Sequence, residues 1–232
     1  MEEQRFRWRE AEREWTMEDL PVLTASVSLP EPIKAGSRAM RRIGWFYQLE
    51  ERSYLHYCQT MLYPKATALC QQARENSAPQ PHCAALLSCR VTYASGGFWS
   101  LTVDSREQIG GHIRIQRRGD TWNLLTGYPV PLSDFFPPHF PVRKHLLHLA
   151  GEEISRQEAA GIACYHESWR QELKHTFNCE NFYLTEEGLC FYWQMQSIAP
   201  VAEGIPTFFI PYGEICRLPD LTPKKRQKGR RS

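Results

Sequence analysis

The chain has 232 residues, of which 42% are hydrophobic and 12% aromatic, and this composition excludes a wholly disordered protein. The length suits one large domain or two small ones. No apolar run approaches the roughly 18 residues that a membrane-spanning helix needs. The charged start MEEQRFRWRE lacks the apolar stretch of a secretory signal, which predicts a cytoplasmic location.

The net charge of +2 is distributed unevenly. Six of the 28 basic residues lie in the last segment, which leaves 22 against 26 acidic residues in the body of the chain. The body is therefore not a nucleic-acid-binding surface by composition. A block of like charge is typical of a disordered, solubilising extension, and it can also contact nucleic acid or anionic lipid non-specifically. The six residues are Lys224, Lys225, Arg226, Lys228, Arg230 and Arg231.

Eight cysteines are even in number, yet without a secretory signal we expect reduced and mostly buried thiols. Cys58 lies in an apolar helical pattern and Cys190 in an apolar strand pattern. Both residues are expected to pack as small hydrophobic groups in the core.

The first third of the chain predicts a strand and two helices after a charged leader. Residues 1–19 are dense in charge and are expected to form a helix. Residues 22–33 read as a strand that ends in prolines. Apolar residues then recur three and four apart after Ser37, a plausible helix N-cap. Pro64 is expected to kink or end that helix, and a second helix follows over about 65–75.

The middle of the chain changes to the pattern of strands. Segments 83–94 and 97–105 are separated by a hairpin signal at Ser95–Gly96. Segment 111–119 alternates apolar and polar residues, and Gly119–Asp120 predicts a turn into a further strand over 121–125.

Segment 131–176 is mainly helical in pattern, with a break at Gly161, and strands follow to residue 216. Because strands and helices are segregated, we expect an α+β fold with antiparallel sheets, segregated helix pairs and two subdomains. The expected division is a charged leader (1–19), an N-terminal subdomain (20–105), a C-terminal subdomain (106–216) and a basic tail (217–232).

Several short motifs occur in a characteristic order along the second half of the chain. They are Gly110–Gly111–His112, Asn123 to Gly127, Leu132 to Phe136, Phe182–Tyr183, Thr185 to Gly188, Ala199–Pro200, Gly204–Ile205–Pro206 and Ile210–Pro211–Tyr212. In this order they resemble a bacterial domain of unknown function. That domain forms the outer part of RsiV-type anti-sigma factors and the N-terminal part of PdaC-type peptidoglycan deacetylases. The resemblance covers 106–216 strongly and 22–216 loosely.

The resemblance implies a non-enzymatic, sensor-like binding module. Its implied ligand is a protein such as lysozyme or a cell-wall glycan, it needs no cofactor, and the family's usual place is outside the membrane. Taken without the resemblance, the glycines and prolines of the motifs shape the backbone at turns and edges. The expected ligand-binding residues are His112, Tyr192, Trp193, Gln194, Pro200, Glu203 and Tyr212.

Three other interpretations stay open on the sequence. His145, His148, Cys164 and His166 are of zinc-ligand type, but their spacing favours surface or packing roles, and no metal site is expected. His112 is a candidate acid or base for a hydrolase that acts on cell-wall material, although no partner residue is marked by a motif. The aromatic residues Phe98, Trp99, Tyr192, Trp193 and Tyr212 are interpreted either as an exposed recognition surface or as ordinary core.

Overall fold

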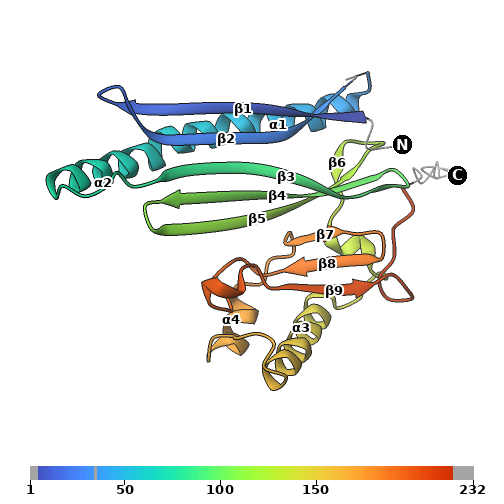
Figure 1. Cartoon of the computed structure of the whole chain (residues 1–232). Coiled ribbons are helices and arrows are strands. Elements are labelled where there is room, and N and C mark those ends of the chain that lie inside the picture. The colour runs from blue at the N-terminus through green and yellow to red at the C-terminus, as the bar shows by residue number, and fades with distance from the viewer. Residues whose placement is uncertain (1–4, 34–35, 222–232) are drawn as a thin grey trace, which may run out of the picture.

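The computed structural model describes residues 5–33 and 36–221. It confirms the α+β class: a six-stranded sheet, in the order β1-β2-β3-β4-β5-β6, lies beside a three-stranded sheet, in the order β7-β8-β9 (Figure 1). The six basic residues of the tail lie outside the described residues. No helix in the described part of the chain is long and apolar enough to cross a membrane.

The predicted charged helix at the N-terminus is wrong, because this segment is strand β1 (Phe6–Met17). It forms a long antiparallel hairpin with β2 (Leu20–Pro32). The charges fit an edge strand because most of its side chains face solvent. Some of them also pair across the sheet or with the neighbouring helix, as in Arg7–Glu31 at 2.7 Å and Arg9–Glu51 at 3.1 Å.

The helices after β2 cross one face of the large sheet. Helix α1 (Arg38–Tyr57) begins where the Ser37 hydroxyl accepts the Met40 N–H, as the sequence predicts. A π-helical turn, η2 (Cys58–Leu62), leads into α2 (Tyr63–Glu75), which has Pro64 in its first turn. Buried residues follow one side of this helical stretch, among them Ile43, Tyr47, Tyr54, Cys58, Leu62, Ala66 and Cys70. That side packs on the sheet.

The helical crossover makes β2 and β3 (Cys83–Ser95) parallel neighbours, from Thr24↔Ala84 to Ser28↔Ser88. The expectation of purely antiparallel sheets is therefore wrong for this one pair. Its physical reason is the connection itself, because a strand that returns after a helix along the sheet face runs parallel to the first.

Strands β3, β4 (Phe98–Ile109) and β5 (His112–Asn123) form an antiparallel meander, and β6 (Tyr128–Pro129) adds a short edge. The predicted turn at Gly119–Asp120 is wrong, since β5 runs through both residues with an unbroken register against β4. The expected subdomain boundary at residues 105 and 106 lies inside β4, and the change from one sheet to the other comes after β6.

The C-terminal part contains the smaller sheet and its helices. After η3 (Leu132–Phe135) come α3 (Val142–Ala159) and α4 (Trp169–His175), with Gly161 at a positive φ of 63° between them. Strands β7 (Phe182–Leu184), β8 (Gly188–Tyr192) and β9 (Thr207–Pro211) form the antiparallel sheet, and η4 (Val201–Glu203) lies in the crossover before β9.

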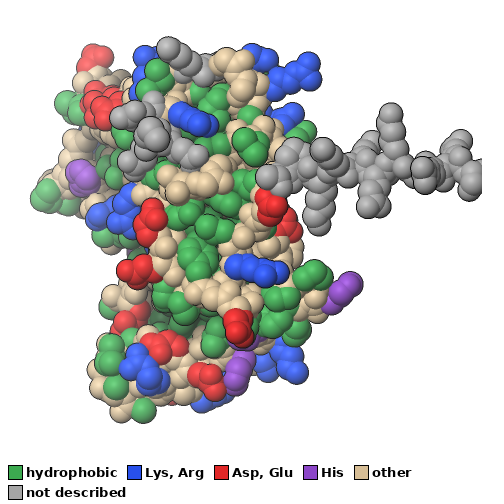
Figure 2. All heavy atoms as spheres, turned by 90° about the vertical axis from the view of Figure 1, so that its right-hand side faces the viewer, with side chains coloured by type: hydrophobic (Ala, Val, Ile, Leu, Met, Phe, Trp, Pro, Cys, Tyr) green, Lys and Arg blue, Asp and Glu red, His purple; other side chains and the backbone are tan. Residues whose placement is uncertain are grey.

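The two sheets meet at β5 and β7 with very little space between their backbones. A Cβ atom at Gly119 would lie only 1.7 Å from the Phe182 carbonyl oxygen, so only glycine fits there. Beside it, the buried Ser100 hydroxyl accepts the Leu184 N–H at 2.9 Å and bonds the Thr121 hydroxyl at 2.8 Å. In Figure 2, apolar side chains run down the middle of one face of the molecule.

A buried polar cluster fixes α1 on the large sheet. The Tyr47 hydroxyl donates to Asp120 at 2.9 Å and accepts the Trp122 indole N–H at 2.9 Å. Burial, followed by the charge of Asp120, raises the pKa of Tyr47 well above its ordinary value, so this hydroxyl keeps its proton.

We predict that Gly119→Ala lowers the free energy of unfolding by about 2 kcal/mol or more, because the new methyl group overlaps the Phe182 carbonyl. Urea unfolding followed by circular dichroism measures this change. Gly111→Ala is the matched control, since nothing lies within 4 Å of a Cβ at Gly111. Equal stability of the two variants would contradict the close approach of β5 and β7.

We predict that Tyr47→Phe costs about 1–3 kcal/mol, because it leaves the buried Trp122 N–H without an acceptor and Asp120 without one donor. The same unfolding measurement applies. Tyr128→Phe is the control, because the Tyr128 ring is exposed and its stacking with Arg42 does not need the hydroxyl. A loss no larger than that of the control would show that the cluster does not stabilise the fold.

Candidate functional site

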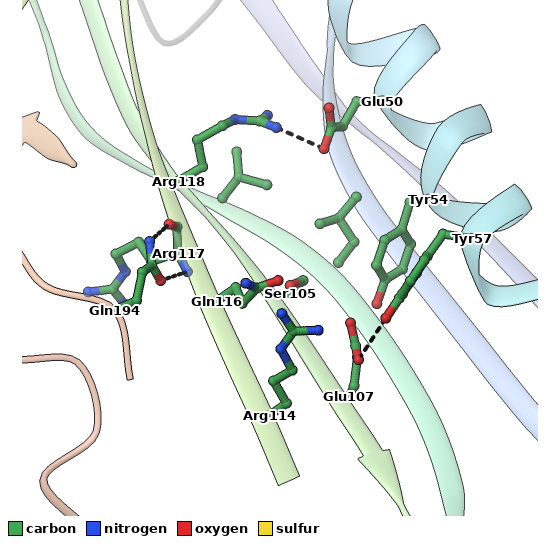
Figure 3. Close-up of a pocket in the computed structure, with 12 residues that line it drawn as sticks. Glu50, Tyr54, Tyr57, Ser105, Glu107, Arg114, Gln116, Arg117, Arg118 and Gln194 are labelled. Atoms are coloured by element: carbon green, nitrogen blue, oxygen red, sulfur yellow. Dashed lines mark hydrogen bonds and ion pairs between the residues drawn. The ribbon is translucent and has the colours of Figure 1, made fainter. Parts of the chain in front are cut away.

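A hollow of about 530 Å³ lies between α1 and the strands β3, β4 and β5 (Figure 3). We call it the charged pocket. It is lined by Glu50, Tyr54, Tyr57, Leu87, Val103, Ser105, Glu107, Arg114, Gln116, Arg117, Arg118 and Gln194. The tyrosines come from the sheet-facing side of α1, and the arginines come from β5.

Most charged groups around the charged pocket neutralise one another. Arg117 holds Asp104 through two hydrogen bonds of 2.8 and 2.7 Å, and these bonds raise the pKa of the arginine. Arg118 contacts both Asp120 and Glu50 at 2.8 Å. These contacts fix the walls of the pocket and leave their arginines little capacity for a ligand.

Glu107 is also held in place, by a neutral donor. Its side chain is 8% exposed and accepts the Tyr57 hydroxyl at 3.1 Å. Burial first, and then the charge of Glu107, raises the pKa of Tyr57, so Tyr57 keeps its proton.

The Arg114 guanidinium and the Tyr54 hydroxyl belong to residues that line the charged pocket, and neither has a partner among the described residues. Arg114 points from β5 into the hollow between Gln116 and Glu107, and no carboxylate of the described chain lies within ion-pair distance of its guanidinium (Figure 3). The Tyr54 hydroxyl is buried and has no hydrogen-bond partner in the described structure. Burial raises the pKa of Tyr54 far above its ordinary value, so it is a donor. A cation beside an unused donor suits a carboxylate.

A second hollow, of about 470 Å³, continues from the first along the helices. It shares Glu107 and Arg114 with the charged pocket and is otherwise lined by α2, the end of η2, the end of β4 and the start of β5. Here the sequence-predicted residue His112 is exposed, near Lys65 and Ile113. His112 therefore lies close to Arg114 but outside the charged pocket.

Among the other expected site residues, Gln194 lines the charged pocket, and Tyr192 lies directly behind it. The Gln194 side chain accepts the Arg117 N–H at 3.0 Å and donates to the Arg117 carbonyl at 2.6 Å. Tyr192 is 2% exposed, and its hydroxyl donates to the same carbonyl at 3.2 Å. Tyr192 thus joins the two sheets and cannot contact a ligand in solution.

The structure does not bring the remaining expected residues to this place. Trp193 is 1% exposed and donates its indole N–H to the Leu173 carbonyl of α4. Tyr212 donates to the Thr185 carbonyl at 3.3 Å. Glu203 accepts the Cys164 N–H beside η4, and the neighbouring Pro200 is exposed. Phe98 and Trp99 are buried too, so these aromatic residues form core, which was the second of the two interpretations.

The histidines and cysteines are spread over the molecule. Burial lowers the pKa of His145, which packs on the Phe140 ring. His148 lies 3.3 Å from Glu152, and His166 lies 2.9 Å from Glu172. The described residues contain no group of three or more His, Cys, Asp or Glu side chains that could hold a metal ion. All eight cysteines are in described segments and are free, with Cys58 and Cys190 buried.

Sequence reasoning missed Arg114 and Tyr54. Arg114 belongs to the alternating segment HIRIQRR, whose even-numbered positions are polar or basic, and this alternation predicts that they share one face of a strand. Tyr54 has no such signal, because a tyrosine in an apolar helical stripe reads as core. Arg114 and Tyr54 line the same pocket only because α1 packs over β5.

Comparisons with known proteins agree with this fold. Residues 133–213 match the family model described as "Protein of unknown function (DUF3298)". A solved DUF3298 family member from Bacteroides fragilis is 17% identical, with 89% of this chain and 90% of that chain covered and a TM-score of 0.59. A solved DUF3298 family protein from Pseudomonas aeruginosa is 13% identical, with 91% and 93% covered and a TM-score of 0.55. No curated protein matches the chain.

The matched segment begins at η3 and ends after β9, so among the residues lining the charged pocket it includes Gln194 alone. At such low identity the two solved proteins show the fold and not the activity. Residues 133–213 thus form a DUF3298 family domain, and the fold of the chain as a whole is similar to that of solved DUF3298 proteins.

Proposed function

We propose that the chain is a non-enzymatic binding module, similar in role to the sensor domain of RsiV-type proteins, and that the charged pocket is its recognition site. The observation that carries the proposal is the pairing pattern inside the pocket. Arg117, Arg118 and Tyr57 are held by carboxylates, whereas the Arg114 guanidinium faces the hollow without a partner in the described chain. The Tyr54 hydroxyl, which is covered in the pocket wall, also has no partner among the described residues.

The ligand chemistry that fits these groups is a carboxylate. Arg114 supplies the charge, and its planar donors match both oxygens of a carboxylate. Tyr54 supplies a neutral donor, since burial keeps its pKa far above neutrality. A buried donor without a partner costs free energy. The Tyr54 hydroxyl is covered, so a ligand oxygen reaches it only when a neighbouring side chain moves, and accepting from Tyr54 then removes this cost.

Both ligand classes implied by the family resemblance can present carboxylates. Cell-wall glycan carries them on its sugars and peptides, and a protein such as lysozyme carries them on aspartate and glutamate side chains. The hydrolase acting on cell-wall material is the alternative of another class, with His112 as its candidate acid or base. Nucleic-acid binding through the basic tail is the third, and it would be lost in a chain that ends at residue 221.

The test is isothermal titration of the full chain with soluble peptidoglycan fragments in one arm and lysozyme in the other. We expect saturable binding in at least one arm. In that arm, Arg114→Ala should weaken the affinity about tenfold or more, because a charge-assisted hydrogen bond contributes about 1.5–3 kcal/mol. Arg52→Ala is the control: it removes the same charge from an exposed position of α1 outside the pocket.

Two results would overturn the proposal. The first is no saturable binding in either arm. The second is binding that falls equally with Arg114→Ala and Arg52→Ala, since that pattern reports only net charge. Release of new reducing ends from the peptidoglycan fragments during the titration would favour the hydrolase instead.

A further inference from the structure

Two residues show which backbone N–H and carbonyl groups of β5 point away from β4, toward the outer edge of the strand. Both the N–H and the carbonyl of Arg117 bond the Gln194 side chain, so the backbone polar groups of Arg117 point away from β4. The Thr121 carbonyl accepts the Val130 N–H on the same side. Backbone direction alternates along a strand, and the β4–β5 register is unbroken. Ile113 and Ile115 therefore also present their N–H and carbonyl groups at this edge.

This edge is covered over its second half and open over its first. Residues Trp122 and Asn123 pair with β6, Gly119 lies against Phe182, and Arg117 is bonded by Gln194. In the described structure no hydrogen bond reaches the outward backbone groups of Ile113 or Ile115. In Figure 1 the first half of β5 extends beyond the smaller sheet. Ile113 is 42% exposed.

Gln194 shows how an added strand would bond here. Its side-chain amide gives one acceptor and one donor to a single residue, at 3.0 and 2.6 Å, as a facing residue does in an antiparallel ladder. An extended peptide that follows this pattern meets Ile115 and then Ile113, which continue the same edge.

The charge of the side chains beside the outer edge of β5 determines which kind of strand can pair with it. The even-numbered side chains beside this edge include His112 and Arg114, and Lys65 lies across the second hollow. A second copy of β5 would bring the same basic residues against these, and like charges across a strand pair are destabilising. A strand with alternating acidic residues would place its carboxylates beside Arg114.

We infer that the open edge of β5, at Ile113 and Ile115, binds an acidic, extended segment of a partner protein by strand addition. The inference deepens the proposed function and rests on it for the role of Arg114. It selects a protein segment as the partner: backbone pairing at the edge supplies affinity, and the carboxylates that face the charged pocket supply specificity.

The test is amide hydrogen exchange by NMR on the full chain, with a short blocked peptide that alternates glutamate and valine as the probe. In the protein alone, the Ile113 and Ile115 amides should exchange fast, and the peptide should slow both at least about tenfold. The Arg114 and Gln116 amides face β4 and serve as internal controls, with no change on peptide addition. Arg114→Ala should weaken peptide binding about tenfold, and Arg52→Ala should not.

Three outcomes would overturn the inference. One is a peptide that shifts the Arg114 resonances but leaves exchange at Ile113 and Ile115 unchanged. Another is equal protection by the same peptide with lysine in place of glutamate. The third is no peptide binding at all. None of these outcomes decides the proposed function, which is tested separately by the titrations with peptidoglycan fragments and lysozyme. Failure of the strand-addition inference can therefore be distinguished from failure of the proposed function.

Discussion

The contact of β5 with β7 at Gly119 is the constraint on which the rest of the molecule depends. The two sheets have separate hydrophobic cores, one under α1 and α2 and the other against α3 and α4. They join where the Phe182 carbonyl occupies the space that a side chain at position 119 would need. Glycine is required in the middle of a strand for this reason, although glycine is normally unfavourable there.

The same contact builds the charged pocket. With β7 and β8 held against β5, the residue that follows the buried pair Tyr192 and Trp193 reaches the Arg117 backbone, and this residue is Gln194. Gln194 thus has two effects: it completes the pocket wall, and it covers one position of the β5 edge. Gln194 lies at the boundary between the charged pocket and the open part of the β5 edge. A ligand bound in the pocket would therefore lie close to a peptide bound at the edge.

Much of the fold follows from local sequence patterns. The Ser37 cap, the apolar stripe of α1 and the helix break at Gly161 were predictable because each is set by neighbouring residues. Strand β1 was not, because an edge strand with charges on its exposed face has the composition of a solvated helix and is fixed by its partner β2. Gly119 was misread as a turn for a similar reason, since its close neighbour Phe182 is distant in sequence.

The candidate site was predictable only in part. Of the expected residues, Gln194 lines the charged pocket and His112 lies in the neighbouring hollow, whereas Arg114 and Tyr54 come together by tertiary packing. Of the two interpretations of the aromatic residues, packing in the core is the one that the structure supports. Both faces of the three-stranded sheet are covered: Tyr192 packs toward β5 and Trp193 toward α4.

The π-helical turn between α1 and α2 has a consequence for how the chain tolerates changes in length. Buried residues Tyr54, Cys58, Leu62, Ala66 and Cys70 are four apart, and in a regular α-helix of 3.6 residues per turn such a series drifts around the axis. The wider turn at Cys58–Leu62 takes up part of this drift. Deleting one residue there would restore α-helical geometry, and because the wider turn already accommodates one extra residue, α2 would keep nearly the same face toward the sheet. Ala66 and Cys70 would stay packed on the sheet, so this turn is a place where relatives of this chain can differ in length by one residue without repacking α2.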